Sequence, residues 1–369
     1  MKPRLLYVVT AARSIKLLDG QLAFMAQYYD VHLIASGGEQ TLDIPREVTF
    51  HELNMEREIS IWKDVRALFQ MLYLIRCIKP DIINYGTPKA SLLAALASQI
   101  WRVPKRIYTL RGLRLETTTG KKRQVLLLFE KLISVCSHQV LCISPSLLEK
   151  AAKLRIATNA KLFCAGSGSS NGMNTAKFEH QDMLSVPTPF SGGNDSVIGY
   201  VGRLTVDKGI DDLVQAFQLI KKDFPNAKLL LVGRLDANHG LQDNTITMIK
   251  RDEAIFLLDY QKHIAPIYRM MDIFVFPTYR EGFGNVAMEA AYTGIPVIAT
   301  DVTGAKDTII HEETGLLVES KNPQAIRDAV AYLLENPVLA RKFGIAGRAR
   351  ITQYFQQETI WNAILQHYS

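Results

Sequence analysis

The feature that most constrains the fold is an alternation of short apolar runs and helical patterns, which occurs twice along the 369 residues. Short apolar runs indicate buried strands, whereas apolar residues three or four positions apart indicate helices. In the first half these patterns predict strands over 5–10, 31–35, 81–84, 106–110 and 139–143, and helices over 20–29, 61–79, 89–101, 124–135 and 145–153, the last with Ser144 as its N-cap. Strands that alternate with helices favour a parallel sheet covered on both faces.

The second half repeats this alternation after a change of texture. Residues 166–172 read G-S-G-S-S-N-G, and residues 185–196 are rich in Pro, Gly and Ser, which is typical of a linker. Strands are then predicted over 197–201, 228–232, 254–258, 273–276 and 297–299, helices over 210–221 and 286–292, and two or three further helices from residue 323 onward. The sequence thus predicts an α/β chain of two Rossmann-like, doubly wound domains facing a cleft, with an N-terminal domain at 1–175, a linker at 176–195, a second domain at 196–350 and a C-terminal helix at 351–369 that packs back on the first domain.

Composition narrows the class of protein. Hydrophobic residues make up 48% of the chain and charged residues 21%, which is typical of a globular protein rather than a disordered one. The four cysteines form no C-x-x-C pair, which favours buried thiols in a reducing compartment. No apolar stretch has the length of a membrane span, and the first ten residues predict a core strand rather than a signal peptide. We therefore expect a cytoplasmic protein.

The charge is divided unevenly between the two halves. Residues 1–175 hold 24 Lys and Arg against 13 Asp and Glu, a net charge of +11, whereas the remainder holds 19 against 23, a net charge of −4. Much of the excess lies in 102–123, and the apolar residues 125–129 follow it. A basic loop beside an apolar helix fits peripheral attachment to the anionic inner face of a membrane, and it would suit a polyprenyl diphosphate-linked acceptor. The alternative is that 126–129 pack inward and that the loop is solvated. Nucleic acid is not an expected partner, because no aromatic residues are interleaved with the basic ones.

The chemistry is concentrated in residues 276–291, which read F-P-T-Y-R-E-G-F-G-N-V-A-M-E-A-A. A strand is expected to end at Pro277, and a helix to begin near Asn285 after two glycines. Such a helix start binds an anion through backbone N–H groups and the helix dipole. The carboxylates of Glu281 and Glu289 flank this anion site, and carboxylates bind hydroxyl groups better than phosphates. A sugar and a ribose on either side of a diphosphate would satisfy all three features. The alternative is that this loop is an ordinary turn and that Glu289 is an exposed helix residue.

A second motif, G-Y-V-G-R-L-T-V-D-K-G at 199–209, adds cations. Gly202 allows a close turn after a strand, and Arg203 and Lys208 follow in a loop where they can bind phosphate oxygens. Gly233 follows another strand, where a base or ribose could pass. The chain has no Walker-type phosphate loop and no D-x-D pair. We therefore expect no metal and no cofactor, with a leaving diphosphate neutralised by Arg203, Lys208 and backbone amides instead of Mg²⁺.

Taken together, these motifs resemble those of the family-4 glycosyltransferases, which have the GT-B fold. The resemblance rests on the E-x7-E element Glu281…Glu289, on G-R-L-…-D-K-G at 202–209, on L-V-G at 231–233, on G-I-P-V-I-A-T at 294–300 and on T-G-L-L-V at 314–318. It covers about 197–350. The first half is similar more loosely, through Y-T-L-R-G-L-R at 108–114 and C-I-S-P-S at 142–146, to bacterial enzymes that build surface polysaccharides or lipid-linked oligosaccharides.

The resemblance implies a retaining transfer of a hexosyl or N-acetylhexosaminyl group from a UDP-sugar to a saccharide acceptor, UDP being the family's commonest donor nucleotide. Glu281 would bind donor-sugar hydroxyls, Glu289 would bind the ribose, and Arg203 and Lys208 would stabilise the leaving diphosphate. The nucleotide would also contact Gly202, Gly233, Gly282, Phe283, Gly284, Asn285 and Val286, with the amides of 283–285 on the distal phosphate. The family's front-face route, in which the leaving phosphate helps to deprotonate the acceptor, is expected because no carboxylate nucleophile is evident.

Three positions depart from the family pattern. Arg111 stands where many relatives have a His, and an Arg stays protonated, so that it can bind a phosphate of donor or acceptor but cannot act as a base at neutral pH. Arg114 is expected to assist it. Asp259 replaces a Gly near the base pocket, and Asn174 replaces an Asp of the linker motif. Two other readings stay open: a nucleotide-sugar epimerase of the same fold, and a non-catalytic subunit that binds nucleotide sugars.

Overall fold

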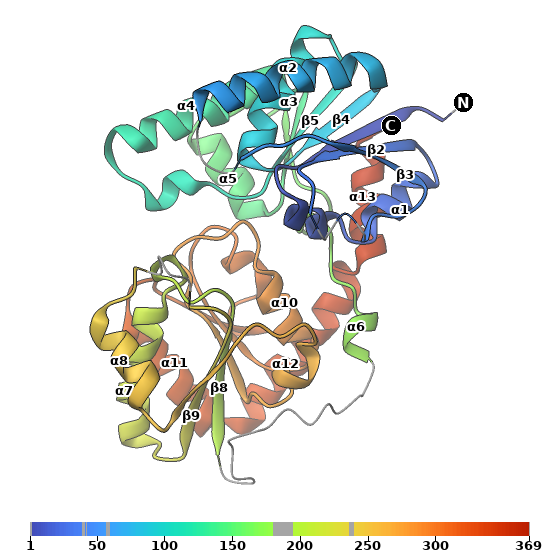
Figure 1. The fold of residues 1–369 in the computed structure, drawn as a ribbon. Coiled ribbons are helices and arrows are strands. Elements are labelled where there is room, and N and C mark those ends of the chain that lie inside the picture. The colour runs from blue at the N-terminus through green and yellow to red at the C-terminus, as the bar shows by residue number, and fades with distance from the viewer. Residues whose placement is uncertain are drawn as a thin grey trace. The chain divides into compact units, whose positions relative to one another are not determined.

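The computed structural model describes residues 2–38, 41, 43–56, 60–179, 195–235 and 240–368. The chain divides into two compact units, unit 1 with Met1–Gly172 and Gln357–Ser369, and unit 2 with Met173–Gln356 (Figure 1). Most of the predicted linker lies outside the described residues, although its first residues form the short helix α6 (Ala176–Glu179). The domain boundary expected at 350 falls inside helix α12 (Pro337–Tyr354), so the C-terminal segment of unit 1 begins later, at Gln357.

Unit 1 contains a seven-stranded sheet in which all neighbouring strands are parallel, in the order β3-β2-β1-β4-β5-β6-β7. The central strands are almost wholly buried because helices cover both faces of the sheet, as their near-continuous apolar sequences predict. The strands are β1 (Arg4–Val8), β2 (Asp30–Ala35), β3 (Val48–Glu52), β4 (Ile82–Tyr85), β5 (Lys105–Leu110), β6 (Gln139–Cys142) and β7 (Leu162–Phe163). The sequence patterns missed β3 and β7, which are the two edge strands and are partly exposed or very short.

The helices of unit 1 connect these strands in a regular way. The three crossovers from β3 to β6 all run in one direction along the sheet, so right-handed connections place their helices α2, α3 and α4 on one face. The Ser144 hydroxyl accepts a hydrogen bond from the Leu147 N–H at 3.2 Å, which confirms the predicted N-cap of α5. The elements are η1 (Ala12–Leu18), α1 (Gln21–Ala26), α2 (Ile61–Ile78), α3 (Pro88–Ile100), η3 (Arg114–Thr117), α4 (Gly120–Cys136), α5 (Pro145–Lys153) and α13 (Gln357–Gln366).

The C-terminal helix α13 belongs to the core of unit 1. Ile360, Ile364 and Tyr368 are buried among residues of β1, β2 and α1. The Tyr368 hydroxyl accepts a hydrogen bond from the Asn84 amide at 2.7 Å and lies 3.2 Å from the Tyr7 hydroxyl. A chain segment nearly 300 residues distant from β4 in sequence therefore completes the hydrogen bonding of that strand.

Unit 2 contains a six-stranded parallel sheet in the order β10-β9-β8-β11-β12-β13. Its strands are β8 (Ser196–Val201), β9 (Ala227–Val232), β10 (Ile255–Leu258), β11 (Ile273–Phe276), β12 (Val297–Thr300) and β13 (Gly315–Val318). Its other elements are η4 (Val206–Lys208), α7 (Ile210–Asp223), α8 (Asp243–Arg251), α9 (Ala265–Tyr268), α10 (Asn285–Tyr292), η5 (Lys306–Thr308) and α11 (Pro323–Glu335). The order of the strands reverses between β8 and β11, and the carboxyl ends at such a switch point are where open α/β sheets bind ligands.

No helix in the described ranges combines the length and apolar character needed to cross a membrane.

Candidate active site

The two predicted glycines lie side by side at the switch point of unit 2. The Gly202 N–H donates to the Val232 carbonyl at 2.9 Å, and the Gly233 N–H donates to the Leu258 carbonyl at 2.8 Å. Gly233 has a φ of +144°, and a Cβ on it would lie 1.9 Å from the Gly202 carbonyl oxygen. A side chain at position 233 would therefore clash with the backbone at the end of β8, so only glycine fits there.

Lys208 and Glu281 meet beside these glycines. The Lys208 ammonium pairs with the Glu281 carboxylate, and their side chains are only 15% and 28% exposed. The contact depends on Gly209, whose φ is +71° and whose Cβ would lie 2.0 Å from the Pro277 carbonyl oxygen. Since the loop after β8 packs directly against the loop after β11, two residues 73 positions apart come together as the motifs implied.

A second ion pair, which the sequence analysis missed, supports the first. Asp207 accepts a hydrogen bond from the Arg280 guanidinium at 3.2 Å and another from the Thr205 hydroxyl at 2.6 Å. Burial alone would raise the pKa of Asp207, but the Thr205 hydrogen bond and the charges of Lys208, Arg280 and Arg203 outweigh it and lower that pKa. Asp207 is thus an anion that holds basic side chains at the switch point. Its only sequence signal was its place beside Lys208.

In the loop before α10, both glycines were expected to let the backbone approach an anion, but Gly284 has a different role. Gly284 has a φ of −126°, which any residue can adopt, so its glycine serves packing instead: a Cβ would lie 2.6 Å from the ring of Phe276. Phe283 is buried against Phe355, with ring centroids 5.4 Å apart, so only its backbone can face a ligand. Gly304, with a φ of +79°, packs against the carbonyl groups of Glu281 and Gly282 in this loop.

Helix α10 begins at Asn285, as predicted, and presents its N-terminus at the end of β11. Asn285 is exposed and Val286 is half-buried. The N–H groups at a helix start and the helix dipole favour an anion at this point. The basic residues lie after β8 and the helix N-terminus after β11, which are neighbouring strands, so both features lie at the same edge of the sheet.

Glu289 lies one helical turn further along α10 and has an unusual protonation equilibrium. Burial raises its pKa to about 7, against the opposing effects of a hydrogen bond from Tyr268 and the charge of Lys177. The Tyr268 hydroxyl lies 2.9 Å from Oε2 of Glu289. Tyr268 comes from the short helix α9 and packs edge-on against Phe274, and no motif pointed to it. The glutamate is therefore about half ionised near neutral pH and has a phenol to orient it.

Asp259 lies at the end of β10, where the family pattern has a glycine. Its carboxylate accepts a hydrogen bond from Nε of Arg234 at 3.3 Å, and the Arg234 guanidinium lies 5.9 Å from the centroid of the Tyr260 ring. All three side chains are exposed. The substitution thus creates a solvent-facing ion pair beside an aromatic ring at the end of the sheet.

Arg111 follows β5 in unit 1. Its guanidinium donates to the Ser170 hydroxyl, while its buried Nε has no hydrogen-bond partner in the described residues. Burial lowers the pKa of Arg111 to about 10, opposed by Tyr368 and Tyr7, so the side chain stays cationic at neutral pH. Arg114 is exposed in η3, and Asn174 follows Met173, which pairs with Gln356 inside unit 2. Arg111 therefore differs from the family pattern and also has a buried hydrogen-bond donor without a partner in the described residues.

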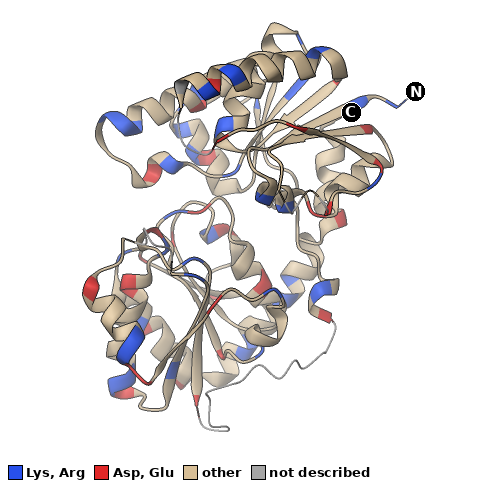
Figure 2. Ribbon diagram, viewed as in Figure 1, with Lys and Arg blue, Asp and Glu red and all other residues tan. Residues whose placement is uncertain are grey.

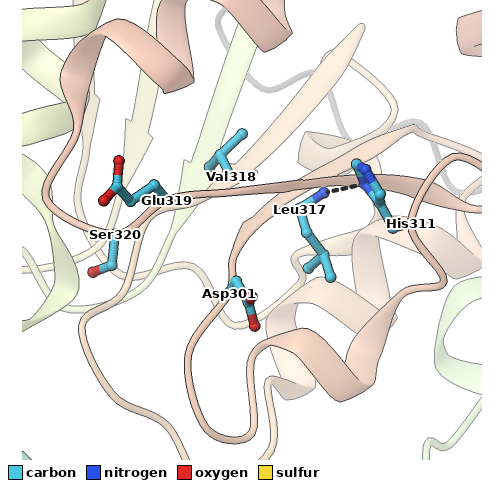
Figure 3. A pocket seen from close by; sticks show the side chains of 6 residues that line it. All are labelled: Asp301, His311, Leu317, Val318, Glu319 and Ser320. Carbon is cyan, nitrogen blue, oxygen red and sulfur yellow. Dashed lines mark hydrogen bonds between the residues drawn. The ribbon is translucent and has the colours of Figure 1, made fainter.

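A hollow elsewhere in unit 2 does not belong to this site. A hollow of about 510 Å³ lies beside β12 and β13, lined by Asp301, His311, Leu317, Val318, Glu319 and Ser320 (Figure 3). Two carboxylates line it, so it is unsuited to a diphosphate, and it contains none of the predicted site residues. Among the described side chains, no group of three or more His, Cys, Asp or Glu is arranged to hold a metal ion.

Comparison with known proteins decides the family. Residues 188–350 match the family model described as "Glycosyl transferases group 1", and residues 4–144 match "Glycosyl transferase 4-like". The capsular polysaccharide biosynthesis glycosyltransferase CapM of Staphylococcus aureus is 37% identical over 368 residues, which cover 99% of this chain and 97% of CapM. The chain belongs to the GT-B glycosyltransferases. It is of the kind that acts in polysaccharide biosynthesis.

One further relative agrees with this assignment, and one solved structure agrees with the fold. The UDP-Gal:alpha-D-GlcNAc-diphosphoundecaprenol alpha-1,3-galactosyltransferase of Escherichia coli is 25% identical over 291 residues, which cover 77% of this glycosyltransferase and 74% of that one. The crystal structure of Anabaena Alr3699/HepE in complex with UDP and glucose matches the fold with a TM-score of 0.79 at 18% identity, covering 99% of this chain and 98% of that one. The two parallel sheets predicted from the sequence are those of this fold.

Proposed function

We propose that this glycosyltransferase is a retaining, family-4 enzyme that moves a hexosyl group from a UDP-sugar to a saccharide acceptor carried on a polyprenyl diphosphate. The observation that carries the proposal is the Lys208–Glu281 ion pair at the switch point of unit 2, beside the N-terminus of α10. A cation and a helix N-terminus suit a diphosphate, and a carboxylate next to them suits the hydroxyl groups of the attached sugar.

The nucleotide would extend from this anion site towards α10 and the end of β9. Glu289, oriented by Tyr268, would accept hydrogen bonds from ribose hydroxyls, and the bare backbone at Gly202 and Gly233 would allow the nucleotide to approach. UDP is proposed as the carrier because the Escherichia coli relative is named for UDP-Gal and the Anabaena structure contains UDP.

Retention by a front-face route is supported by the nearby carboxylates, because each of the three already has a hydrogen-bond or ion-pair partner. Glu281 pairs with Lys208, Glu289 bonds to Tyr268, and Asp207 bonds to Arg280 and Thr205. A double displacement needs a carboxylate directed at the anomeric carbon. We therefore propose that the leaving phosphate, stabilised by Arg203 and Lys208, accepts the proton of the acceptor hydroxyl.

The acceptor is proposed to bind unit 1 as an anion. Arg111 remains charged at neutral pH, and its guanidinium could bind a phosphate oxygen of the acceptor. The net charge of +11 over residues 1–175 would favour a diphosphate-linked acceptor electrostatically. The name of the Escherichia coli relative, which specifies a diphosphoundecaprenol acceptor, agrees with this proposal.

The experiment that tests the donor site is calorimetry with UDP, GDP and ADP, each with and without EDTA. We expect tight binding of UDP alone, with no effect of EDTA. The Arg203→Ala variant should weaken it by about tenfold or more, because a charge-assisted hydrogen bond to phosphate is lost. Binding that requires Mg²⁺, or that Arg203→Ala leaves intact, would contradict the proposed neutralisation of the diphosphate.

The raised pKa of Glu289 predicts a pH-dependent affinity for the donor. In the free enzyme the folded state binds this proton more tightly than the unfolded chain does, so the contribution of Glu289 to stability falls as pH rises from 4.5 to about 7. Ribose hydroxyls donate to the ionised form, so affinity for a UDP-sugar should rise through the same window. We expect binding at pH 6 to be about tenfold weaker than at pH 8, measured by calorimetry. The Glu289→Gln variant should bind weakly at both values, and a pH-independent wild type would refute this role.

A further inference from the structure

Helix α2 of unit 1 carries a row of large aromatic side chains that nothing in the described structure covers. Trp62, Phe69 and Tyr73 are 87%, 67% and 68% exposed. Arg66 lies between these residues in the sequence, and Arg76 follows them. The spacing of all five along the helix places them on one face. The opposite face carries Ala67, Met71 and Ile75, which are buried against the unit. The helix is therefore apolar on two sides, one of which faces solvent.

Helix α4 repeats this arrangement. It begins at Gly120, earlier than the sequence analysis predicted, so the basic residues 121–123 form its first turn instead of a loop. Val125, Leu128, Leu132 and Val135 are exposed and share one face with Lys121. Of the apolar residues 125–129 considered for membrane contact, Val125 and Leu128 are exposed, whereas 126, 127 and 129 are half-buried. The exposed face of α4 is thus longer than the sequence suggested and lies further along the helix.

The two exposed faces belong to one side of unit 1. Helices α2 and α4 both pack against α3, whose middle residues are mostly buried, and all three cover the same face of the sheet (Figure 1). We call the exposed aromatic face of α2 and the exposed aliphatic face of α4 the α2–α4 surface. Apolar patches of this kind on a folded unit mark an interaction site.

The charge around the α2–α4 surface has one sign. Each helix contains a single carboxylate, and each is engaged away from that surface: Asp64 pairs with Lys89 at 2.6 Å, and Glu130 accepts from the Tyr108 hydroxyl at 2.6 Å. Basic residues are more numerous, and Figure 2 shows them along α2 and at the beginning of α4. Lys63 pairs with an exposed carboxylate, that of Glu56. A partner for this surface must accept apolar side chains and carry negative charge.

We propose that the α2–α4 surface docks on an anionic phospholipid bilayer. Trp and Tyr prefer the boundary between water and lipid, apolar side chains insert beneath it, and Lys and Arg bind anionic headgroups. A second copy of the chain is a poorer occupant, because two such basic faces would repel one another. The inference deepens the proposed function, since a lipid-linked acceptor lies in the membrane, but it rests on the surface of unit 1 and not on the donor site.

The test is vesicle co-sedimentation of the full chain without donor or acceptor. Vesicles of phosphatidylcholine with about 30% phosphatidylglycerol should bind the protein, and those of phosphatidylcholine alone should bind it about tenfold less. The Trp62→Ser, Phe69→Ser, Tyr73→Ser triple variant and the Lys121→Glu, Lys122→Glu double variant should each lower binding to anionic vesicles by about tenfold. Brominated lipid should quench the emission of Trp62, taken as the difference between the wild type and Trp62→Phe.

Matched controls come from unit 2. Tyr332, Val338 and Ile345 are exposed on α11 and α12, and their triple replacement with Ser should leave vesicle binding unchanged. The same holds for Arg341→Glu, Lys342→Glu, a pair of exposed basic residues on α12. An unchanged circular dichroism spectrum and melting temperature would show that each variant is folded. Neither measurement depends on nucleotide binding, so that a failure of this inference is distinct from a failure of the donor site.

Three results would overturn the inference. One is a wild-type protein that binds neither vesicle, and another is a triple aromatic variant that binds as the wild type does. The third is dimerisation that the triple variant abolishes, without vesicle binding, which would assign the α2–α4 surface to a second copy of the chain.

Discussion

The Glu281→Ala variant is expected to lose at least about 1000-fold in kcat/KM for sugar transfer. The carboxylate would hold the donor sugar, and it also holds Lys208, whose ammonium would stabilise the leaving phosphate. Removing it therefore disturbs both partners of the reacting bond. The side chain is 28% exposed, forms one ion pair and accepts one further hydrogen bond, from the Gly282 N–H at 3.2 Å, so the melting temperature should fall by no more than about 4 °C. Steady-state kinetics and a thermal melt measure the two effects.

Two companion variants show whether the loss is specific. Asp223→Ala removes another carboxylate of unit 2, which pairs with Arg327, and it should leave transfer unchanged. If Lys208 and Glu281 act as one unit, Lys208→Ala combined with Glu281→Ala should cost little more than Glu281→Ala alone. An active Glu281→Ala enzyme would remove Glu281 from the reaction, whereas strictly additive losses would mean that Glu281 and Lys208 act independently.

The second large effect is expected from Gly233→Ala, as a loss of stability. The new Cβ would lie 1.9 Å from the Gly202 carbonyl oxygen, and the backbone at φ +144° is unfavourable for any side chain. Neither backbone can move without breaking the hydrogen bonds that join the ends of β8, β9 and β10. We expect a cost of about 3 kcal/mol or more, and a melting temperature about 6–12 °C lower for a unit of this size, measured by calorimetry or circular dichroism.

A second glycine separates the clash from the backbone strain. Gly294 also has a positive φ, +86°, but its Cβ would meet no atom within 4 Å. Gly294→Ala should therefore cost only about 1 kcal/mol, the ordinary penalty of the left-handed region. Equal losses in the two variants would mean that the contact between Gly233 and Gly202 is unimportant. A stable Gly233→Ala protein that still fails to bind UDP would place the clash with the ligand instead of with the fold.

The local part of the site could be predicted because its signals are local. A strand that ends at Phe276, a loop with Glu281 and a helix that begins at Asn285 follow from residues within one short stretch. Helix caps and strand lengths are decided by neighbours in sequence, so Ser144 could be assigned as an N-cap. The edge strands β3 and β7 could not be found in this way, because their side chains are only partly buried and their apolar pattern is weak.

By itself, the sequence determined the class of fold and the order of most strands along the chain, and it supplied the residues that we propose for the anion site. Only the tertiary structure decided which side chains meet. Lys208 contacts Glu281 because Gly209 allows the two loops to come together. Tyr268, which no motif indicated, contacts Glu289 because α9 packs against α10. It also decided which side of α2 is the core. Trp62 and Met71 lie on apolar faces of one helix, and periodicity is the same for a buried face and an exposed one. Burial is a property of what packs against a helix, and that depends on residues far away in sequence.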